Sequence, residues 1–340
     1  MSLGKKKILS QGASGGGGAT DYFIPKLYSG GASGQVISQV GFQPDLIIGK
    51  RRDSAEHWWI NDVARPGKSM FLNLPDAEIS FQYTTPNSDG FVVNGSGGVH
   101  NTGNLVAYCF KGGGSTSSNT TGSITSQVSA NVNSGFSVIK FDGAGLSGSA
   151  STVGHGLNSA PEFFLIKTYE PGLSVSAWFA YAAGAGNTKE GYIQASQFFT
   201  DANRWNSTSP TTSVITLGSS FSAHLTHYGG DTIIYAFHSV AGKQKVGTYT
   251  ATGSAGSPTI STGFQPRFVM VKNIAKNQEW IVVDSARNNG ANSLRPESNA
   301  AENTAGDNAI TLSPTSFTIA VSGSGVNYQS GDTFIYLAIA

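Results

Sequence analysis

Two pairs of aspartates have the residue type and the repeated placement that could serve acid–base chemistry. Asp62 and Asp284 occupy matching places in two related segments, and Asp231 and Asp332 do so in another pair of segments. Glycan cleavage uses two carboxyl groups that face each other across a cleft, about 5 to 10 Å apart. A single active site has no need of several copies of its residues, so the recurrence favours structural turns or strand-edge contacts. We therefore assign no catalytic residue.

Other residues offer less chemistry. His224 and His227 resemble a metal-binding pair, but an i,i+3 spacing on a strand directs the two rings to opposite faces, and we expect no metal. The glycine runs at 15–18 and 112–114 match no phosphate-binding loop and precede no helix that could receive an anion. No serine lies in a Gly-x-Ser-x-Gly turn between a strand and a helix. The sequence thus predicts neither a nucleophile nor a cofactor.

The basic residues near these candidates have structural interpretations. Arg65 and Arg287 follow Asp62 and Asp284 by three residues, which predicts an ion pair within each segment. The lysines at 5–7 precede a glycine run. Three such charges on a mobile arm are most simply solvated, and contact with nucleic acid inside a particle is the alternative.

The segments that carry these residues are copies of one another, about a hundred residues apart. Gly-Phe-Gln-Pro stands at 41–44 and again at 263–266, and a looser copy stands at 156–161. Each copy continues with an apolar run that ends in lysine, a tryptophan followed by an apolar residue, and a final strand with tyrosine five residues after glycine. These landmarks are Lys50, Lys167 and Lys272, then Trp59, Trp178 and Trp280, and lastly Tyr108, Tyr235 and Tyr336. A period of this length is typical of whole small domains.

Short strand patterns dominate between the landmarks. The segments 136–141, 163–166, 214–217 and 317–321 are rich in β-branched or aromatic residues and are bounded by polar residues or glycine. No window sustains the apolar period of a helix over three turns. Roughly six or seven short strands per hundred residues are typical of an antiparallel sandwich. The sequence predicts an all-β protein with three tandem antiparallel β-sandwich domains preceded by a flexible N-terminal arm.

The repeats set the expected domain boundaries. Residues 1–20 form a flexible Gly-rich arm, 21–111 the first sandwich, 134–241 the second and 242–340 the third. The Gly/Ser/Thr-rich segment 112–133 is expected to be a linker, whose second half could add a strand leading into the second sandwich. The tryptophan of each copy should be largely buried, because a core of this size needs one bulky side chain.

Composition limits the class of protein. Charged residues make up 12% of the chain, about half the usual share, and glycine accounts for 44 of 340 positions. The net charge of +1 gives no broad field for nucleic acid, and no apolar stretch approaches the ~20 residues of a membrane span. The single cysteine, Cys109, lies in an apolar strand and is expected to be a buried small hydrophobe. The N terminus lacks the apolar core of a signal peptide, so we expect assembly in a cytoplasm.

Three segments form an ordered set: 106–131, its continuation over 135–167, and a later unit over 246–272. In this order they resemble a repeat family of tailed-phage virion proteins, many of them from marine phages, which are described as structural or tail-fibre-like. The resemblance covers residues 22–340. It implies tandem β-sandwich domains in a virion protein, and it transfers no catalytic residue because none is known for the family. This chain is short and shows no long shaft or tail-anchoring domain.

The expected function follows from this resemblance and from a composition with few charges and many small residues. Both favour a non-enzymatic bacteriophage virion structural protein, located in the virion as a tail-associated fibre or host-binding component. A capsid-surface decoration or head-fibre protein is the alternative, and a polysaccharide depolymerase or a carbohydrate-binding module is the rival class. An aromatic platform at Trp58 or Trp205 would favour the glycan binder, and a groove with paired carboxylates would favour the enzyme.

The expected partners are other virion proteins, reached through the arm at 1–20, and further copies of the chain. Sandwiches with few charges leave sheet edges to protect, and association with identical neighbours would bury them. A trimer is favoured by analogy with fibre-like phage proteins. A host surface glycan or receptor would be a further partner, whereas nucleic acid and membrane insertion are not expected.

Overall fold

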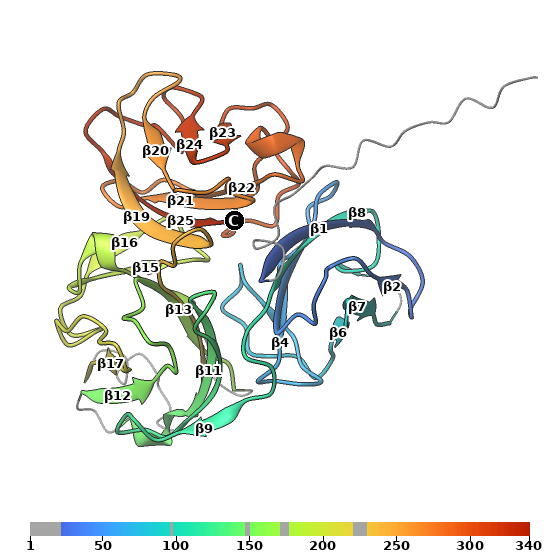
Figure 1. Ribbon diagram of the computed structural model, residues 1–340, viewed down its shortest axis with the longest axis vertical. Helices are drawn as coiled ribbons and strands as arrows, with labels where there is room; N and C mark the ends of the chain where they lie inside the picture. Colours follow the sequence, from blue (N-terminus) through green and yellow to red (C-terminus); the bar gives the residue numbers. More distant parts are fainter. Residues whose placement is uncertain (1–21, 96–97, 147–149, 171–176, 220–229) are drawn as a thin grey trace, which may run out of the picture.

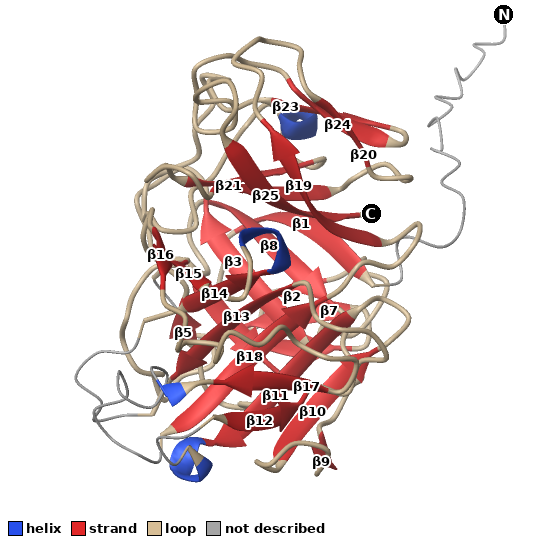
Figure 2. Cartoon of the chain, turned by 90° about the vertical axis from the view of Figure 1, so that its left-hand side faces the viewer, coloured by secondary structure: helices blue, strands red, loops and turns tan. Residues whose placement is uncertain are grey.

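The computed structural model describes residues 22–340 apart from 96–97, 147–149, 171–176 and 220–229. Within these residues the chain is built of antiparallel strands in three β-sandwiches, as the sequence predicts (Figures 1 and 2). Among the described residues, the connections contain the short 3-10 turns η1 (Gly143–Gly145), η2 (Ala183–Ala185) and η3 (Asn288–Gly290). The arm expected at 1–20 lies outside the described residues.

Each sandwich consists of a main sheet and a smaller facing sheet. The first has the main order β1 (Phe23–Ser29), β8 (Asn104–Phe110), β3 (Leu46–Arg51), β4 (Trp59–Asp62), β5 (Met70–Phe71), faced by β2 (Val36–Ile37), β7 (Gly90–Val93), β6 (Thr84–Asn87). The second has the main order β16 (Phe198–Thr200), β15 (Lys189–Tyr192), β14 (Phe179–Ala182), β13 (Phe163–Thr168), β18 (Asp231–Phe237), β11 (Phe136–Asp142), β10 (Ser126–Asn131), β9 (Ser117–Asn119), faced by β12 (Ser151–Gly154) and β17 (Val214–Leu217). The third has the main order β19 (Gln244–Thr250), β25 (Thr333–Ile339), β21 (Phe268–Asn273), β22 (Trp280–Asp284), faced by β20 (Thr259–Ser261), β24 (Ser316–Ile319), β23 (Ile310–Ser313).

Four strands of each main sheet are equivalent between the sandwiches. The order β1-β8-β3-β4 of the first recurs as β11-β18-β13-β14 in the second and as β19-β25-β21-β22 in the third. The register also recurs in the pairs β3–β8, β13–β18 and β21–β25. In each pair the first residue of the first-named strand lies opposite the last residue of the second. Equivalent residues can therefore be assigned directly from the pairing.

The main sheets bury both of their faces. The inner face of each packs on its own facing sheet, which gives each sandwich a separate apolar core. The outer faces of all three main sheets meet in a fourth core at the centre of the molecule. Figure 1 shows the three sandwiches arranged around this centre. The strands that border the centre, such as β13 and β21, are consequently buried along their whole length, which explains their unbroken apolar runs.

The strand expected in the second half of the segment 112–133 is present, but the first half is not the plain linker expected from its composition. The segment contains β9 and β10, which extend the main sheet of the second sandwich by pairing in sequence onto β11. Buried serines are tolerated in β10 because their hydroxyls have partners: Ser126 donates to the carbonyl of Gly154 at 2.8 Å, and Ser129 Oγ accepts from the backbone N–H of Gly113 at 2.9 Å. The Gly-rich part that remains, at 112–114, passes close to the backbone of Ala130.

Two of the residue matches expected between the copies, those of Trp59 and Tyr336, are wrong by one residue. The residue equivalent to Trp178 and Trp280 is Trp58, whereas Trp59 faces the core inside the first sandwich. Likewise Leu337, not Tyr336, points to the centre from β25. Since successive side chains of a strand alternate between its faces, a slip of one residue exchanges the central face for the inner face.

Candidate functional site

Three tryptophans of the central core join the sandwiches in a ring. Each indole Nε1 donates to a backbone carbonyl of a neighbouring sandwich: Trp58 to Arg295 at 3.0 Å, Trp178 to Phe71 at 2.9 Å, and Trp280 to Tyr192 at 2.8 Å. The first sandwich thus contacts the third, the third contacts the second, and the second contacts the first. We call these contacts the first–third, third–second and second–first joints, with the sandwich that donates the indole hydrogen bond named first. All three side chains are buried, as the sequence predicts for Trp178 and Trp280.

The backbone N–H of each tryptophan is also held in an equivalent way. It donates to a side-chain oxygen of its own sandwich. In each sandwich this acceptor lies two residues after the residue whose carbonyl accepts the indole N–H of a neighbouring sandwich. The acceptors are Asn73 at 3.0 Å, Gln194 at 2.9 Å and Glu297 at 3.2 Å. Burial, together with the nearby charge of Glu279, raises the pKa of the Glu297 carboxyl to about 7. The same position is therefore neutral in two sandwiches and ionisable in the third.

The predicted ion pair between Asp284 and Arg287 is present and forms part of the first–third joint. Arg287 Nε donates to Asp284 Oδ2 at 2.6 Å, and Arg287 Nη1 lies 3.0 Å from Glu302 Oε1. The hydroxyl of Tyr108 on β8 donates to the same Asp284 oxygen at 2.7 Å. Burial, followed by the neighbouring Asp284, raises the pKa of Tyr108 well above its ordinary value, so its hydroxyl remains a donor.

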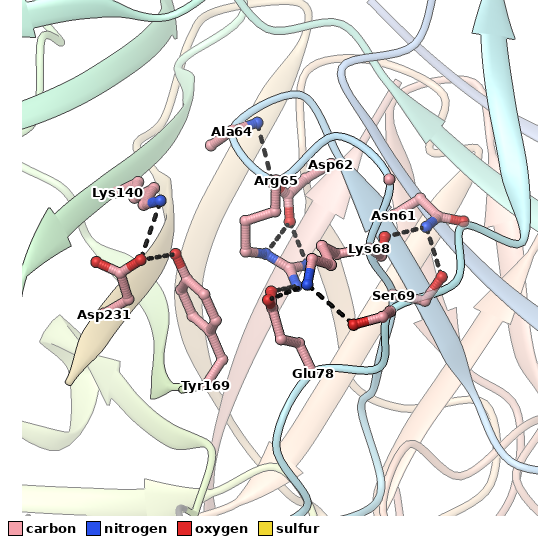
Figure 3. A network of polar contacts seen from close by, with 12 residues as sticks. Asn61, Asp62, Ala64, Arg65, Lys68, Ser69, Glu78, Lys140, Tyr169 and Asp231 are labelled. Atoms are coloured by element: carbon pink, nitrogen blue, oxygen red, sulfur yellow. Dashed lines mark hydrogen bonds and ion pairs between the residues drawn. The ribbon is translucent and has the colours of Figure 1, made fainter. Parts of the chain in front are cut away.

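The pair between Asp62 and Arg65 occupies the equivalent place in the second–first joint. Arg65 Nε donates to Asp62 Oδ2 at 2.9 Å, and Tyr235 from the second sandwich donates to that oxygen at 2.6 Å. Figure 3 shows Arg65 between Asp62 and Glu78, with the Lys140–Asp231 pair and Tyr169 beside it. The carboxylates of Asp62 and Asp284 are buried and bound by arginine and tyrosine, which explains why these two aspartates recur.

The third–second joint has no such network at the equivalent positions. Leu337 replaces the tyrosine, Ala182 replaces the aspartate, and Ala185 replaces the arginine three residues later. All three belong to or pack against the central apolar core. The turn η2 lies close against β19, where a side chain on Gly184 would collide with Thr248. Small apolar residues therefore let the two sandwiches approach closely.

Three buried lysines mark the ends of equivalent strands. Lys50, Lys167 and Lys272 occupy the same position in β3, β13 and β21 and are fully buried. Lys272 Nζ donates to the carbonyls of Asn273 and Gln278 at 2.7 and 2.6 Å, and so fixes the turn that follows its strand. Burial lowers the pKa of Lys50 and Lys272 to about 8 and that of Lys167 to about 7.

The other residues considered from the sequence also have structural surroundings. Asp332 accepts a hydrogen bond from Asn273 at 2.8 Å, and burial raises the pKa of the Cys109 thiol. Trp58 and Trp205 are both 1% exposed and so provide no aromatic platform. His224 and His227 lie outside the described residues. Within the part of the chain that the structure describes, no group of three or more His, Cys, Asp or Glu could hold a metal.

An open groove of about 560 Å³ lies on the third sandwich. Its polar lining comes from segments far apart in sequence: Glu279, Arg295, Asp307 and Asn308. Arg295 Nη1 lies 3.0 Å from Glu279 Oε1 across the start of β22. The loop 320–325, which consists of small residues, forms the remaining wall. Sequence reasoning missed this site because none of its residues belongs to a spaced motif.

Buried Asn327 holds the walls of the groove in place. Its Nδ2 donates to the carbonyls of Val321 and Ser254, both at 2.9 Å, while its Oδ1 accepts from the backbone N–H of Gly253 at 2.9 Å. One side chain therefore links the 320–325 loop to the turn after β19. The groove is rigidly framed even though its loop has no regular structure.

Residues 18–340 match the family described as "Domain of unknown function (DUF7483)". The chain belongs to this family. Among curated proteins, none matches the sequence. No helix in the described part of the chain is long and apolar enough to cross a membrane. The description of the family names no activity.

Proposed function

We propose that the chain is a non-enzymatic structural protein of a tailed-phage virion, and within it a tail-associated fibre or host-binding component. The observation that carries the proposal is the closed ring of three sandwiches. Because the ring buries the outer faces of all three main sheets in one core, it forms a rigid body suited to the outside of a particle. The resemblance of the repeated segments to virion proteins supports the same role.

The surroundings of the recurring carboxylates support a role without turnover. Asp62 and Asp284 each accept from an arginine and from a tyrosine of the next sandwich, so neither is free to contact a substrate. Incubation of the purified protein with host polysaccharide should release no sugar. Measurable cleavage that a single carboxylate substitution abolishes would contradict this part of the proposal.

Labelling of intact particles tests the location. Antibodies against the three-sandwich body should mark the tail in electron micrographs of the phage that encodes the chain. Label on the head would favour the decoration or head-fibre alternative. Absence of the chain from purified particles, checked by mass spectrometry, would contradict a virion role.

The arm at 1–20 is proposed to join the body to other virion proteins. Ordering a Gly-rich segment costs roughly 1 to 2 kcal/mol per residue, so contact with a partner is needed to hold it. A variant that lacks residues 1–20 should fold normally but fail to enter particles. Normal incorporation of this variant would contradict the assignment.

A trimer of chains stays a prediction, and it depends on sheet edges that identical neighbours would cover. The apolar outer faces of the main sheets are covered within one chain by the sister sandwiches, so these faces do not contribute to association between chains. Light scattering decides: a mass well above 35.3 kDa supports association, and a strictly monomeric species at high concentration contradicts it.

A further inference from the structure

A cavity of about 50 Å³ lies in the central core, where the outer faces of the three main sheets meet. Its wall is made of aliphatic and aromatic side chains from all three sandwiches. Protein interiors are close-packed and contain few spaces larger than a water molecule. A cavity of this size at the centre of the ring is therefore a candidate binding site.

The cavity lies on the axis of the ring, because equivalent residues of the three sandwiches line it. One equivalent set consists of the third residues of β3, β13 and β21, which are Ile48, Leu165 and Met270. A second set consists of the residues that precede the acceptors of the tryptophan backbone N–H groups, namely Leu72, Ile193 and Pro296. Three similar surfaces thus meet around one line and leave part of it unfilled.

The wall exposes no polar atom to the cavity within the residues that the structure describes. Trp58 Nε1 donates to the carbonyls of Arg295 and Ser298, at 3.0 and 3.1 Å. The hydroxyl of Tyr108 donates to Asp284 at 2.7 Å. A water molecule in a cavity needs about two to four polar partners, and apolar cavities stay dry. The cavity is therefore suited to an apolar occupant.

The third sandwich has smaller side chains than the first at two positions of the wall. Val282 lies opposite Met270, whereas its equivalent in the first sandwich, opposite Ile48, is Ile60. Leu337 occupies the position of Tyr108. Both Val282 and Leu337 line the cavity, so these smaller side chains contribute to the unfilled space.

We propose that this cavity binds one small molecule without hydrogen-bonding groups, such as a short hydrocarbon. An apolar cavity of about 150 Å³ holds a benzene ring, so a third of that volume has room for roughly two carbon atoms or one xenon atom. The occupant regains the dispersion contacts that the wall atoms lack at an empty space. A polar molecule of the same size would lose its hydrogen bonds to water and form none. Such a site is independent of where the chain lies on a particle.

Xenon and ethane are the probes, and methanol is the polar comparison of similar size. Methyl NMR spectra of the full chain should shift at Ile193 and Met270 when either gas is added, because both side chains line the cavity. The methyl groups of Ile47 and Ile281 lie in the cores inside the first and third sandwiches and should not shift. Methanol should shift neither set.

Val282→Ile adds a methyl group to the wall and installs the side chain of Ile60. It should weaken xenon binding roughly tenfold or more, because filled space resists further packing. Val271→Ile is the matched control, since Val271 lies in the core inside the third sandwich and its equivalent in the second sandwich is Ile166. This control should leave the xenon affinity unchanged.

Ile193→Val removes a methyl group from the wall and should raise the affinity for propane relative to ethane. This variant tests the cavity even if Val282→Ile impairs folding. Absence of gas-dependent shifts at Ile193 and Met270, equal shifts at Ile47 and Ile281, or shifts caused equally by methanol would overturn the inference. So would equal xenon affinities of Val282→Ile and Val271→Ile, or an unchanged preference between propane and ethane in Ile193→Val.

Discussion

The first–third joint and the third–second joint close the same ring with different chemistry. The first–third joint buries a tyrosine hydroxyl, a carboxylate and a guanidinium in contact, through Tyr108, Asp284 and Arg287. The third–second joint places Leu337, Ala182 and Ala185 at the equivalent positions. Both joints keep the indole hydrogen bond of the ring tryptophan. The backbone geometry therefore does not require the polar network.

Buried ion networks often add little net stability over apolar side chains of similar volume. In this protein the buried ion networks determine the order in which the three sandwiches follow one another around the ring. In a ring that ran the opposite way, Tyr108 would meet Ala182 and lose its acceptor, while Leu337 would meet Asp62 and leave a buried charge without its tyrosine. Because one of three joints is apolar, only the observed order of sandwiches satisfies every buried polar group at these positions. The asymmetry specifies how three similar domains assemble.

The largest expected effect comes from the contact that all joints share. Trp280→Ala should lower the free energy of unfolding by about 3 to 5 kcal/mol, the usual cost of removing a buried aromatic side chain. Denaturant titration with fluorescence or circular dichroism measures it. Trp280→Phe is the matched variant, which keeps most of the packing and loses mainly the 2.8 Å bond to Tyr192, so it should cost much less. A loss below 1 kcal/mol for Trp280→Ala would show that the ring is not a cooperative unit.

The second prediction converts a polar joint into an apolar one. Asp284→Ala alone should cost about 3 to 5 kcal/mol, because buried Arg287 keeps only Glu302 as a partner and the buried hydroxyl of Tyr108 loses its acceptor. The triple variant Tyr108→Leu, Asp284→Ala and Arg287→Ala installs the side chains of the third–second joint. It should recover a large part of that loss, since Glu302 keeps Arg52 at 2.8 Å as a partner. Denaturant midpoints measure both. A triple variant less stable than Asp284→Ala would contradict the equivalence of the joints.

A third prediction concerns two residues that lie opposite each other on neighbouring strands. In the first sandwich a very small residue faces a very large one, whereas in the other two sandwiches both residues are of intermediate or large size. Gly49 lies opposite Trp59, whereas Ile166 lies opposite Phe179 and Val271 opposite Ile281. A Cβ on Gly49 would collide with the Trp59 ring, so Gly49→Val should cost about 1 to 3 kcal/mol or more by overpacking.

Adding Trp59→Ile to Gly49→Val reproduces the pair of the third sandwich. The double variant should be more stable than the sum of the two single changes predicts, because residues in contact are coupled. Thermal unfolding of the four proteins in this cycle measures the coupling. Additive losses would show that the two sandwiches do not share this packing.

The strands and the three sandwiches could be predicted because their signals are local. Short β-branched runs and repeated Gly-Phe-Gln-Pro segments carry the pattern within each copy. In the segment 112–133 a strand in the second half was predicted and is present as β10, but the edge strand β9 was not predicted. The three residues of β9 are Ser, Ser and Asn with no buried side chain, so their composition does not differ from that of a linker.

The ring could not be predicted, because contacts between copies leave no local spacing. One signal was available: Asp62 and Arg65 have counterparts in the third copy but not in the second, where Ala182 and Ala185 stand. To interpret this signal, one must know which residue of the last strand is equivalent to Tyr108. In the third copy that residue is Leu337, which lies one residue farther from the preceding glycine than Tyr108 does, so the sequence pattern points to Tyr336 instead. The groove was still less accessible, because its residues meet only through the folding of four separate segments.

The smallest expected effect concerns Glu297, the one ionisable residue among the three side chains that accept the backbone N–H of a ring tryptophan. Glu297 and Gln194 each accept the backbone N–H of their ring tryptophan, at 3.2 and 2.9 Å. Burial raises the pKa of Glu297 from 4.5 to about 7. The folded state therefore favours the protonated carboxyl, so its contribution to stability is complete below pH 4.5 and is lost as the pH rises through about 7.

Glu297→Gln installs the side chain of the second sandwich and removes this titration. At pH 5 the variant and the parent should be about equally stable, and at pH 8 the variant should be more stable by about 1 to 2 kcal/mol, since one pKa unit corresponds to 1.36 kcal/mol and partial exposure screens the effect. Comparing the difference between the two proteins at each pH cancels every other titrating group. Gln194→Glu is the converse control and should introduce the same loss above pH 7 in the second sandwich. A stability difference that does not change with pH would show that Glu297 is already ionised at pH 5 in the folded chain, and that the three acceptor positions do not share one buried environment.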